Sequence, residues 1–172
     1  MMNSRRHPLA GLIFLAIVLG LATVALAQDS ATVITGTELN RIMPPGFYFQ
    51  GLSAPTQMRN SAAVRFGTKR FVLAGLVDTT GYSSDIRAKY EGFFITDSPI
   101  KVQGSELAPG AYGFGFSNDG KLTLLDLTAK EVLSVSATKD NALTRPRPLM
   151  MTNSSEGVRF YNGKDYVVIS PN

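Results

Sequence analysis

A period-two alternation of apolar and polar residues runs through most of this chain and constrains its fold more than any other feature. In "KEVLSVSA" (130–137), the side chains of Leu133, Val135 and Ala137 fall on one face of an extended chain, and the residues between them fall on the other. A similar run, "GKLTLLDL" (120–127), precedes it after a gap of only two residues. Because successive side chains of a strand point to opposite faces, this pattern predicts paired, half-buried strands.

Three short turn signals indicate where neighbouring strands join. Asn162-Gly163 lies between two β-rich runs, and an Asn-Gly pair suits a tight hairpin. Asn118-Asp119-Gly120 and Gly67-Thr68 have the same setting. Together with their flanking runs they predict an all-β chain of eight or nine short strands, arranged as a single antiparallel meander barrel or sandwich. The run "FVLAGLV" (71–77) is apolar on both faces and predicts a central, covered strand.

Two segments depart from the strand pattern. In "DTTGYSSDIRAKYEG" (78–92), Ser83 or Ser84 suits an N-cap and apolar side chains follow at a spacing of four, so we expect one short helix near 83–90. "TRPRPL" (144–149) contains two prolines, which lack the N–H donor of a central strand. It is therefore expected to be an edge strand or a connector.

A short motif occurs twice, as "GTELNRIMPPGFYF" (36–49) and "GSELAPGAYGFGF" (104–116). Each copy has Gly, a hydroxyl residue, Glu-Leu, a spacer, and then Pro-Gly-x-Tyr with phenylalanine after it, and each predicts a turn that leads into an aromatic strand. In the second copy, Pro109 presets φ, and we expect Gly110 to take the positive φ of a type II turn. Internal duplication of a half-barrel is a second hypothesis, although the spacers differ in length.

The strand that follows the second motif, "AYGFGF" (111–116), alternates rings with glycines. Tyr112 and Phe114 share one face, and Gly113 and Gly115 share the other. Alternating glycines indicate either a close approach to the backbone or a sharp bend of the sheet. The aromatic face is expected to be core, because large rings are mostly buried; the alternative is a platform for a sugar or another flat ligand.

Residues 1–27 have the three parts of a secretory signal peptide. Two arginines form a basic start, residues 9–27 carry no charge, and "ALA" at 25–27 suits cleavage before Gln28. This pattern predicts export to the periplasm or beyond of a single β-rich domain, 28–172. The alternative is a membrane anchor formed by residues 9–27, since about 20 apolar residues span a bilayer.

The predicted mature chain lacks the residues on which many catalytic and metal sites depend. The sequence has no cysteine or tryptophan, and its one histidine, His7, lies in the predicted signal peptide. This composition excludes Ser-His-Asp and Cys-His nucleophiles and zinc or copper sites built on imidazole or thiolate. Without the two arginines of the signal, 15 basic and 13 acidic residues remain, too balanced for a typical nucleic-acid binder. We therefore expect no metal, no cofactor and no nucleic-acid partner.

The segment "KVQGSELAPGAYGFGF" (101–116) resembles the strand, Leu-x-Pro-Gly-x-Tyr turn and strand of small exported bacterial β-domains of unknown function. The wider chain, including "FVLAGLVDTTGYSSDIRAKYEGFF" (71–94) and "RPRPL" (145–149), is similar to uncharacterised secreted proteins of soil bacteria such as acidobacteria. The resemblance implies export and a β fold, and it transfers no catalytic residue.

Carboxylates are the groups that remain for catalysis. Asp78, Asp85, Glu91 and Asp97 are candidates for the acid and base of glycoside hydrolysis. Acids spread over loops are also what any exposed surface carries. Asn118-Asp119-Gly120 is expected to be a turn and not a calcium site, because it lacks the further acids of a calcium loop.

The densest cluster of polar and aromatic residues lies in and beside the predicted helix. It comprises Tyr82, Asp85, Arg87, Lys89, Tyr90 and Glu91. These side chains are candidates for a ligand-binding lid or rim, and the alternative is a solvated helix face. We expect a non-enzymatic exported binding module for a small molecule, a glycan or an envelope protein, with membrane contact only through an uncleaved N-terminal segment. The alternatives are a carboxylate-dependent carbohydrate hydrolase or lyase and a purely structural surface protein.

Overall fold

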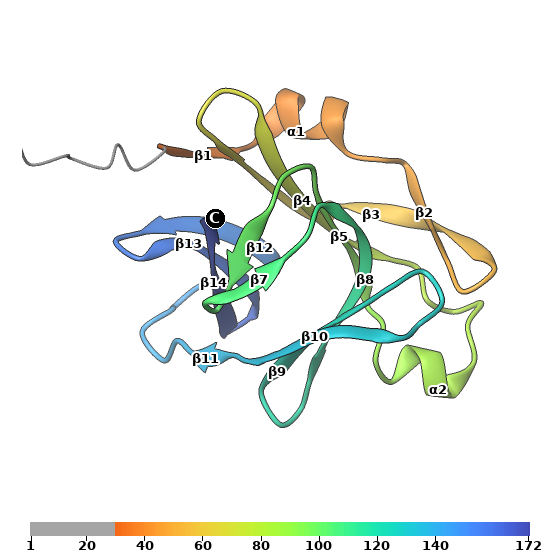
Figure 1. Ribbon diagram of the computed structural model, residues 1–172. Helices are drawn as coiled ribbons and strands as arrows, with labels where there is room; N and C mark the ends of the chain where they lie inside the picture. The colour runs from red at the N-terminus through yellow and green to blue at the C-terminus, as the bar shows by residue number, and fades with distance from the viewer. Residues whose placement is uncertain (1–29) are drawn as a thin grey trace, which may run out of the picture.

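The computed structural model describes residues 30–172, and these form two antiparallel sheets packed as a sandwich, not a closed barrel (Figure 1). The prediction of an all-β fold is confirmed, although fourteen strands occur in this part of the chain because several are only two to four residues long. The strands are β1 (Ala31–Ile34), β2 (Gly46–Phe49), β3 (Leu52–Phe66), β4 (Arg70–Val77), β5 (Gly92–Thr96), β6 (Ile100–Val102), β7 (Ser105–Leu107), β8 (Gly110–Ser117), β9 (Lys121–Leu125), β10 (Glu131–Ser136), β11 (Thr138–Lys139), β12 (Arg147–Ser154), β13 (Gly157–Gly163) and β14 (Asp165–Pro171).

The larger sheet has the order β1-β3-β4-β5-β8-β9-β10, with β2 pairing beside β1 on the long strand β3. The smaller sheet has the order β12-β13-β14-β6-β7, and β11 also pairs with β14. Strand β4 is central, as its apolar sequence predicts, and the proline-containing strand β12 is an edge, also as predicted. Only Ala137 separates β10 from β11, so one continuous extended segment crosses from the larger sheet to the smaller one.

The three predicted hairpins are confirmed by the strand pairing. Asn162 pairs with Asp165, Ser117 with Lys121, and Phe66 with Arg70, which leaves two or three residues in each turn. Each turn contains the glycine that the sequence placed there. Local turn chemistry therefore sets the register of these pairs.

The main core lies between the sheets and is built from aromatic and aliphatic side chains of both. Phe114 of the larger sheet and Phe160 of the smaller one are fully buried, with ring centroids 5.5 Å apart. Phe94 packs against the same ring at 5.6 Å. Burial of a side chain of this size stabilises the fold by about 1.5–3 kcal/mol. This core fixes the position of the two sheets, and it confirms that Phe114 and Tyr112 are core residues.

A second apolar cluster covers the opposite face of the larger sheet. Phe49 of β2 and Tyr90 stack there with ring centroids 4.0 Å apart. A Cβ atom at Gly113 would lie 2.5 Å from the Phe49 ring, and one at Gly115 would lie 2.5 Å from the Lys89 carbonyl oxygen. Gly113 and Gly115 of β8 therefore leave the space into which β2 and the segment before β5 dock, and the predicted close approach is confirmed.

The prediction for Gly110 is wrong in its mechanism. Gly110 does not adopt a positive φ; it is the first residue of β8. A Cβ atom at Gly110 would lie 2.9 Å from the hydroxyl oxygen of Tyr112. That hydroxyl donates to the Ala108 carbonyl at 2.9 Å, the arrangement known as a tyrosine corner. Glycine is needed at 110 because the ring of Tyr112 folds back over it.

Two helices occur within residues 30–172, where the sequence predicts one. Helix α2 (Ser84–Arg87) lies in the predicted place but is a single turn, with Ser83 as a cap whose side chain makes no capping hydrogen bond. Helix α1 (Gly36–Ile42) was not predicted. Neither helix is long or apolar enough to cross a membrane, and the predicted signal peptide, 1–27, lies outside the described residues.

Candidate functional site

The two tyrosines of the predicted site serve the fold. Tyr82 and Tyr90 are buried in the second cluster with ring centroids 5.2 Å apart, edge to face. The Tyr82 hydroxyl donates to the Leu52 carbonyl at 3.2 Å, whereas the Tyr90 hydroxyl is buried without a hydrogen-bond partner. Burial raises the pKa of both phenols, with the neighbouring Tyr82 adding to the shift at Tyr90. Both rings hold segment 78–91 against the sheet.

Glu91 is half-buried and joins the ends of the two sheets. Its Oε2 atom accepts a hydrogen bond from the Phe116 backbone N–H at 3.0 Å and another from Asn162 Nδ2 at 2.7 Å. Burial raises the pKa of this carboxyl, and the two hydrogen bonds oppose the shift in part. Because Phe116 belongs to β8 and Asn162 to β13, Glu91 is a polar link between the layers.

Asp85, Arg87 and Lys89 are the exposed members of the predicted site. The Lys89 ammonium donates to the Ala129 carbonyl at 3.5 Å, which places this segment beside the loop between β9 and β10. Asp85 lies within the single turn of α2 and accepts from Ser84 Oγ at 3.5 Å. The structure thus divides the six predicted residues into three that pack or link the fold and three that face solvent.

Beside segment 78–91, the tip of the β2–β3 hairpin is hydrogen-bonded to the β9–β10 loop, which is distant from it in sequence. The Gln50 backbone N–H donates to the Leu127 carbonyl at 3.0 Å, and Gln50 Nε2 donates to the Thr128 carbonyl at 2.7 Å. Gln50 and Gly51 form the tight β2–β3 turn, both with positive φ. The two hydrogen bonds hold this turn on the β9–β10 loop.

The β9–β10 loop is itself ordered by one carboxylate. Asp126 Oδ1 accepts from the backbone N–H groups of Thr128 at 2.8 Å and Lys130 at 3.1 Å. Hydrogen bonds from these two residues, those from the Thr128 side chain first, hold the pKa of Asp126 below its ordinary value. The β2–β3 turn and the β9–β10 loop therefore both have a defined geometry, and we call the place where they meet the junction.

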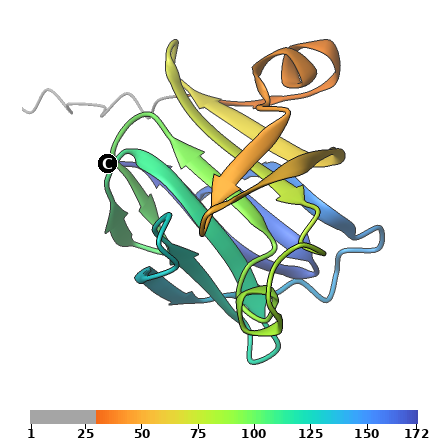
Figure 2. The same cartoon turned by 90° about the vertical axis from the view of Figure 1, so that its right-hand side faces the viewer.

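The large apolar side chains that are exposed within residues 30–172 all lie at this junction. They are Tyr48 at 57%, Leu52 at 45%, Leu127 at 41% and Val132 at 48% exposure. Each is within four residues of Gln50 or Thr128 along the chain. We call these four residues the junction surface. The β2–β3 tip, α2 and the β9–β10 loop lie together on the right of Figure 1, and Figure 2 turns that side toward the viewer.

A groove of about 270 Å³ adjoins the junction surface. Its walls include Leu52 and Tyr82, and its polar groups include Asp78 and Thr80. Asp78 Oδ1 accepts from the Thr80 backbone N–H at 3.0 Å, a bond that lowers the pKa of the carboxyl. The groove brings together one residue of the predicted site and one residue of the junction surface.

Three of the four candidate carboxylates, Asp78, Glu91 and Asp97, accept hydrogen bonds from backbone N–H groups, whereas Asp85 accepts from the Ser84 side chain. Asp97 Oδ1 accepts from the Phe71 N–H at 2.9 Å, and Asp78 and Glu91 are occupied as described above. Within residues 30–172, no group of three or more His, Cys, Asp or Glu side chains is placed to hold a metal ion. Asp119 lies in the predicted hairpin turn and forms an ion pair with Lys121 at 3.2 Å.

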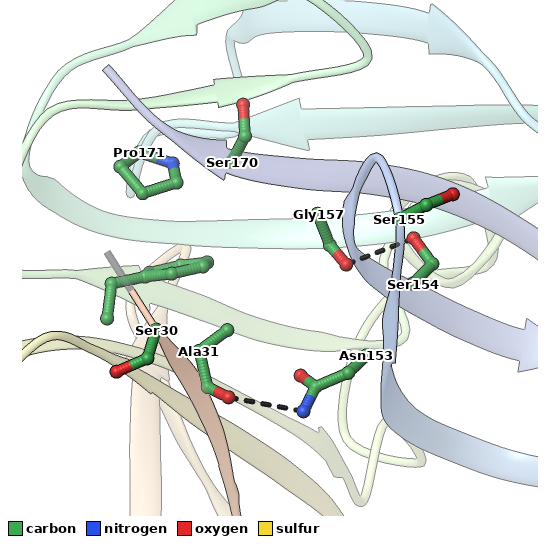
Figure 3. Close-up of a pocket in the computed structure, with 9 residues that line it drawn as sticks. Ser30, Ala31, Asn153, Ser154, Ser155, Gly157, Ser170 and Pro171 are labelled. Atoms are coloured by element: carbon green, nitrogen blue, oxygen red, sulfur yellow. Dashed lines mark hydrogen bonds between the residues drawn. The ribbon is translucent and has the colours of Figure 1, made fainter. Parts of the chain in front are cut away.

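A more polar cleft of about 330 Å³ lies at the other end of the sandwich, between β1 and the β12–β13 turn (Figure 3). Asn153 Nδ2 donates across it to the Ala31 carbonyl at 3.1 Å, and Ser154 Oγ donates to the Gly157 carbonyl at 3.0 Å. Its lining residues carry hydroxyl and amide groups but no charged side chain, and its one aromatic ring, that of Phe66, is buried. It offers few groups that would orient a ligand.

Sequence reasoning did not identify the junction surface. Tyr48 was expected in an aromatic strand, but its exposure follows from the two buried phenylalanines beside it, which take the other face of β2. A usable signal was Gln50-Gly51 between two β-rich runs, where a residue with a side-chain amide precedes a turn glycine. The partner loop at 127–128 could not be inferred, because no local pattern records it.

Comparison of the chain with protein-family models, with curated proteins and with solved structures finds no match.

Proposed function

We propose that this chain is an exported, non-enzymatic binding domain that contacts another protein of the cell envelope through the junction surface. The observation that carries the proposal is the gathering of all four exposed large apolar side chains of residues 30–172 at one junction. Contiguous exposed apolar surface with a polar border is typical of protein contact sites.

The composition of this surface favours a protein partner. A tyrosine with 57% exposure, Tyr48, stands among aliphatic side chains, and tyrosine is enriched among residues that dominate binding energy. The border carries both signs of charge, with Lys89, Lys130 and Glu131 exposed. An anionic lipid surface selects clusters of lysine and arginine instead.

The rigidity of the junction also supports recognition. The β2–β3 turn is fixed by two hydrogen bonds from Gln50, and the opposite loop by Asp126. A surface that is already ordered loses less conformational entropy on binding. The adjoining groove, with Leu52 and Tyr82 in its walls, offers a place for one side chain of the partner.

Site-specific photo-crosslinking in the native host tests the proposal. A photoreactive phenylalanine derivative at position 48 should give a discrete protein adduct, and the same derivative at Arg145 should not. Arg145 is exposed and belongs to the connection between β11 and β12, which lies on the left of Figure 1, opposite the junction.

The adduct should disappear when Leu52→Ser is combined with the probe at position 48, because the apolar surface is then interrupted. Equal adducts from positions 48 and 145, or an adduct that survives Leu52→Ser unchanged, would contradict the proposal.

A further inference from the structure

A second groove, of about 290 Å³, lies where the two sheets approach each other under helix α1. Strand β1 pairs with β3 from Ala63 onward, and β2 pairs with β3 as far as Pro55. Helix α1 connects β1 to β2 (Figure 1) and passes the part of β3 between these two pairings. Residues of β12 line the opposite side of the groove. The groove is therefore bounded by two stretches of strand edge.

An arginine lies at a break in the pairing of each of these two strands. The register of β3 with β4 shifts between Thr56 and Ser61, and Arg59 is within that interval. The register of β12 with β13 shifts between Arg147 and Met150. Such irregularities turn a side chain away from its regular direction and are frequent beside binding sites. Both Arg59 and Arg147 line the groove.

The charge of these two arginines is not balanced within the groove. Its lining residues include no aspartate or glutamate. Elsewhere on the surface, Arg65 pairs with Glu38 at 3.2 Å and Arg159 with Asp140 at 3.7 Å. Within residues 30–172, neither Arg59 nor Arg147 forms an ion pair. Two guanidinium groups beside one groove therefore offer donors and charge to an anion.

Adaptable apolar side chains form part of the groove, beside the polar residues Thr35, Asn40 and Ser61. Leu39 of α1, Met58 of β3 and Met150 of β12 are only partly buried and line it beside the arginines. Methionine side chains adjust to irregular shapes. The volume of about 290 Å³ is close to the lower end of the range for small-molecule sites.

We propose that this groove binds a small organic anion, with one oxyanion group on Arg59 and Arg147 and a short apolar part on Leu39, Met58 and Met150. The oxyanion chemistry is shared by carboxylates and phosphate monoesters. This site lies apart from the junction surface and does not depend on the protein contact proposed above.

Titration of the chain, expressed from its full sequence, tests this site by two-dimensional NMR of backbone amides and arginine Nε–H groups. The probes are hexanoate, phenyl phosphate, inorganic phosphate and the neutral cyclohexanol. At least one of the two organic anions should shift the Nε–H signals of Arg59 and Arg147 and the amide signals of Met58 and Met150. Preference for hexanoate or for phenyl phosphate identifies the oxyanion, and inorganic phosphate and cyclohexanol should each bind more weakly.

Arg59→Met and Arg147→Met should each weaken binding of the preferred anion by about tenfold, the effect of one charge-assisted hydrogen bond. The matched controls Arg65→Met and Arg145→Met should change it by less than about twofold, since exposed charges act weakly at a distance. Arg59→Lys keeps the charge but lacks the planar guanidinium, so its affinity for the anion should lie between those of the parent and of Arg59→Met. Because Arg59 and Arg147 are exposed, their variants should keep the amide spectrum of the folded parent. Failure of both organic anions to bind, equal loss in the controls, or cyclohexanol binding as well as the anions would overturn the proposal.

Discussion

The two copies of the Pro-Gly-x-Tyr motif have similar sequences but differ in burial and in secondary structure. In the second copy, Tyr112 is 8% exposed and faces the core between the sheets. In the first, Tyr48 is 57% exposed, and Phe47 and Phe49 on either side of it are buried. The lead-in differs as well, because Glu-Leu of the first copy lies in helix α1 and Glu-Leu of the second lies in strand β7. The two lead-ins therefore give internal duplication no structural support.

The contrast follows from the position of each strand. Strand β8 has a strand neighbour on both sides, β5 and β9, and covers the main core. Strand β2 pairs with β3 alone and lies across the outer face of the larger sheet, with Phe49 over Gly113. In both places the motif gives a bend at the proline, followed by an aromatic strand. The tertiary environment decides which face of the strand is buried, and in β2 it leaves the tyrosine to solvent.

The largest expected difference between the copies is in stability. Phe114→Ala should lower the free energy of unfolding by about 3–5 kcal/mol through lost burial and the cavity left behind. Tyr48→Ala should change it by less than about 0.5 kcal/mol, as for other exposed positions. Urea denaturation of the two variants measures both values. A comparable loss for Tyr48→Ala would show that the first copy also builds the core.

The contact between the copies can be tested at Gly113. Gly113→Ala should destabilise the protein by about 1–3 kcal/mol, because the added methyl group overlaps the ring of Phe49. Combining it with Phe49→Leu should recover part of that loss. A double-mutant cycle of thermal or urea unfolding measures the coupling, and strict additivity would mean that the two side chains do not meet.

A smaller effect is expected for the tyrosine hydroxyls. Tyr112→Phe removes the hydrogen bond to the Ala108 carbonyl and should cost about 0.5–1.5 kcal/mol. Tyr48→Phe should be neutral within error, because the residue is 57% exposed. Equal melting temperatures for the two variants would contradict a stabilising role for the hydrogen bond from Tyr112 to Ala108.

The smallest effect concerns Glu91, which holds the end of β8. Burial raises the pKa of Glu91 in the folded protein above its ordinary value, so the folded state takes up a proton at higher pH than the unfolded state does. The contribution of Glu91 to the free energy of unfolding should therefore rise as pH falls from neutral through the folded pKa, and it should level off below the pKa of the unfolded state. Glu91→Gln should abolish this part of the pH dependence. Urea unfolding of both proteins between neutral and mildly acidic pH measures it, and parallel curves would contradict the shift.

Local chemistry accounts for what could be predicted from the sequence. Turn residues such as Asn162-Gly163 and the alternation around Leu133 and Val135 predict hairpins whose geometry depends on neighbours a few residues away. The paired glycines of β8 predicted a close approach without revealing its partner, because Phe49 is distant in sequence.

The remaining features depend on tertiary contacts. Tyr82 and Tyr90 were placed in a binding rim, but these rings, together with β2, cover an apolar area on the outer face of the larger sheet. Helix α1 was missed because its residues repeat a lead-in that is extended in the other copy. The junction surface depends on hydrogen bonds from Gln50 to a loop that is distant in sequence; Thr128, one of the acceptors, is 78 positions away.

The most direct test of the account compares the same tyrosine-to-serine change in the two copies, by thermal unfolding and by photo-crosslinking with the photoreactive probe placed at Leu127 in each protein. Tyr48→Ser should melt like the parent and lose the protein adduct. Tyr112→Ser should melt at a lower temperature and keep the adduct at temperatures where it remains folded. A Tyr48→Ser protein that gives the parental adduct, or that unfolds as readily as Tyr112→Ser, would contradict the assignment of the first copy to binding and the second to the fold.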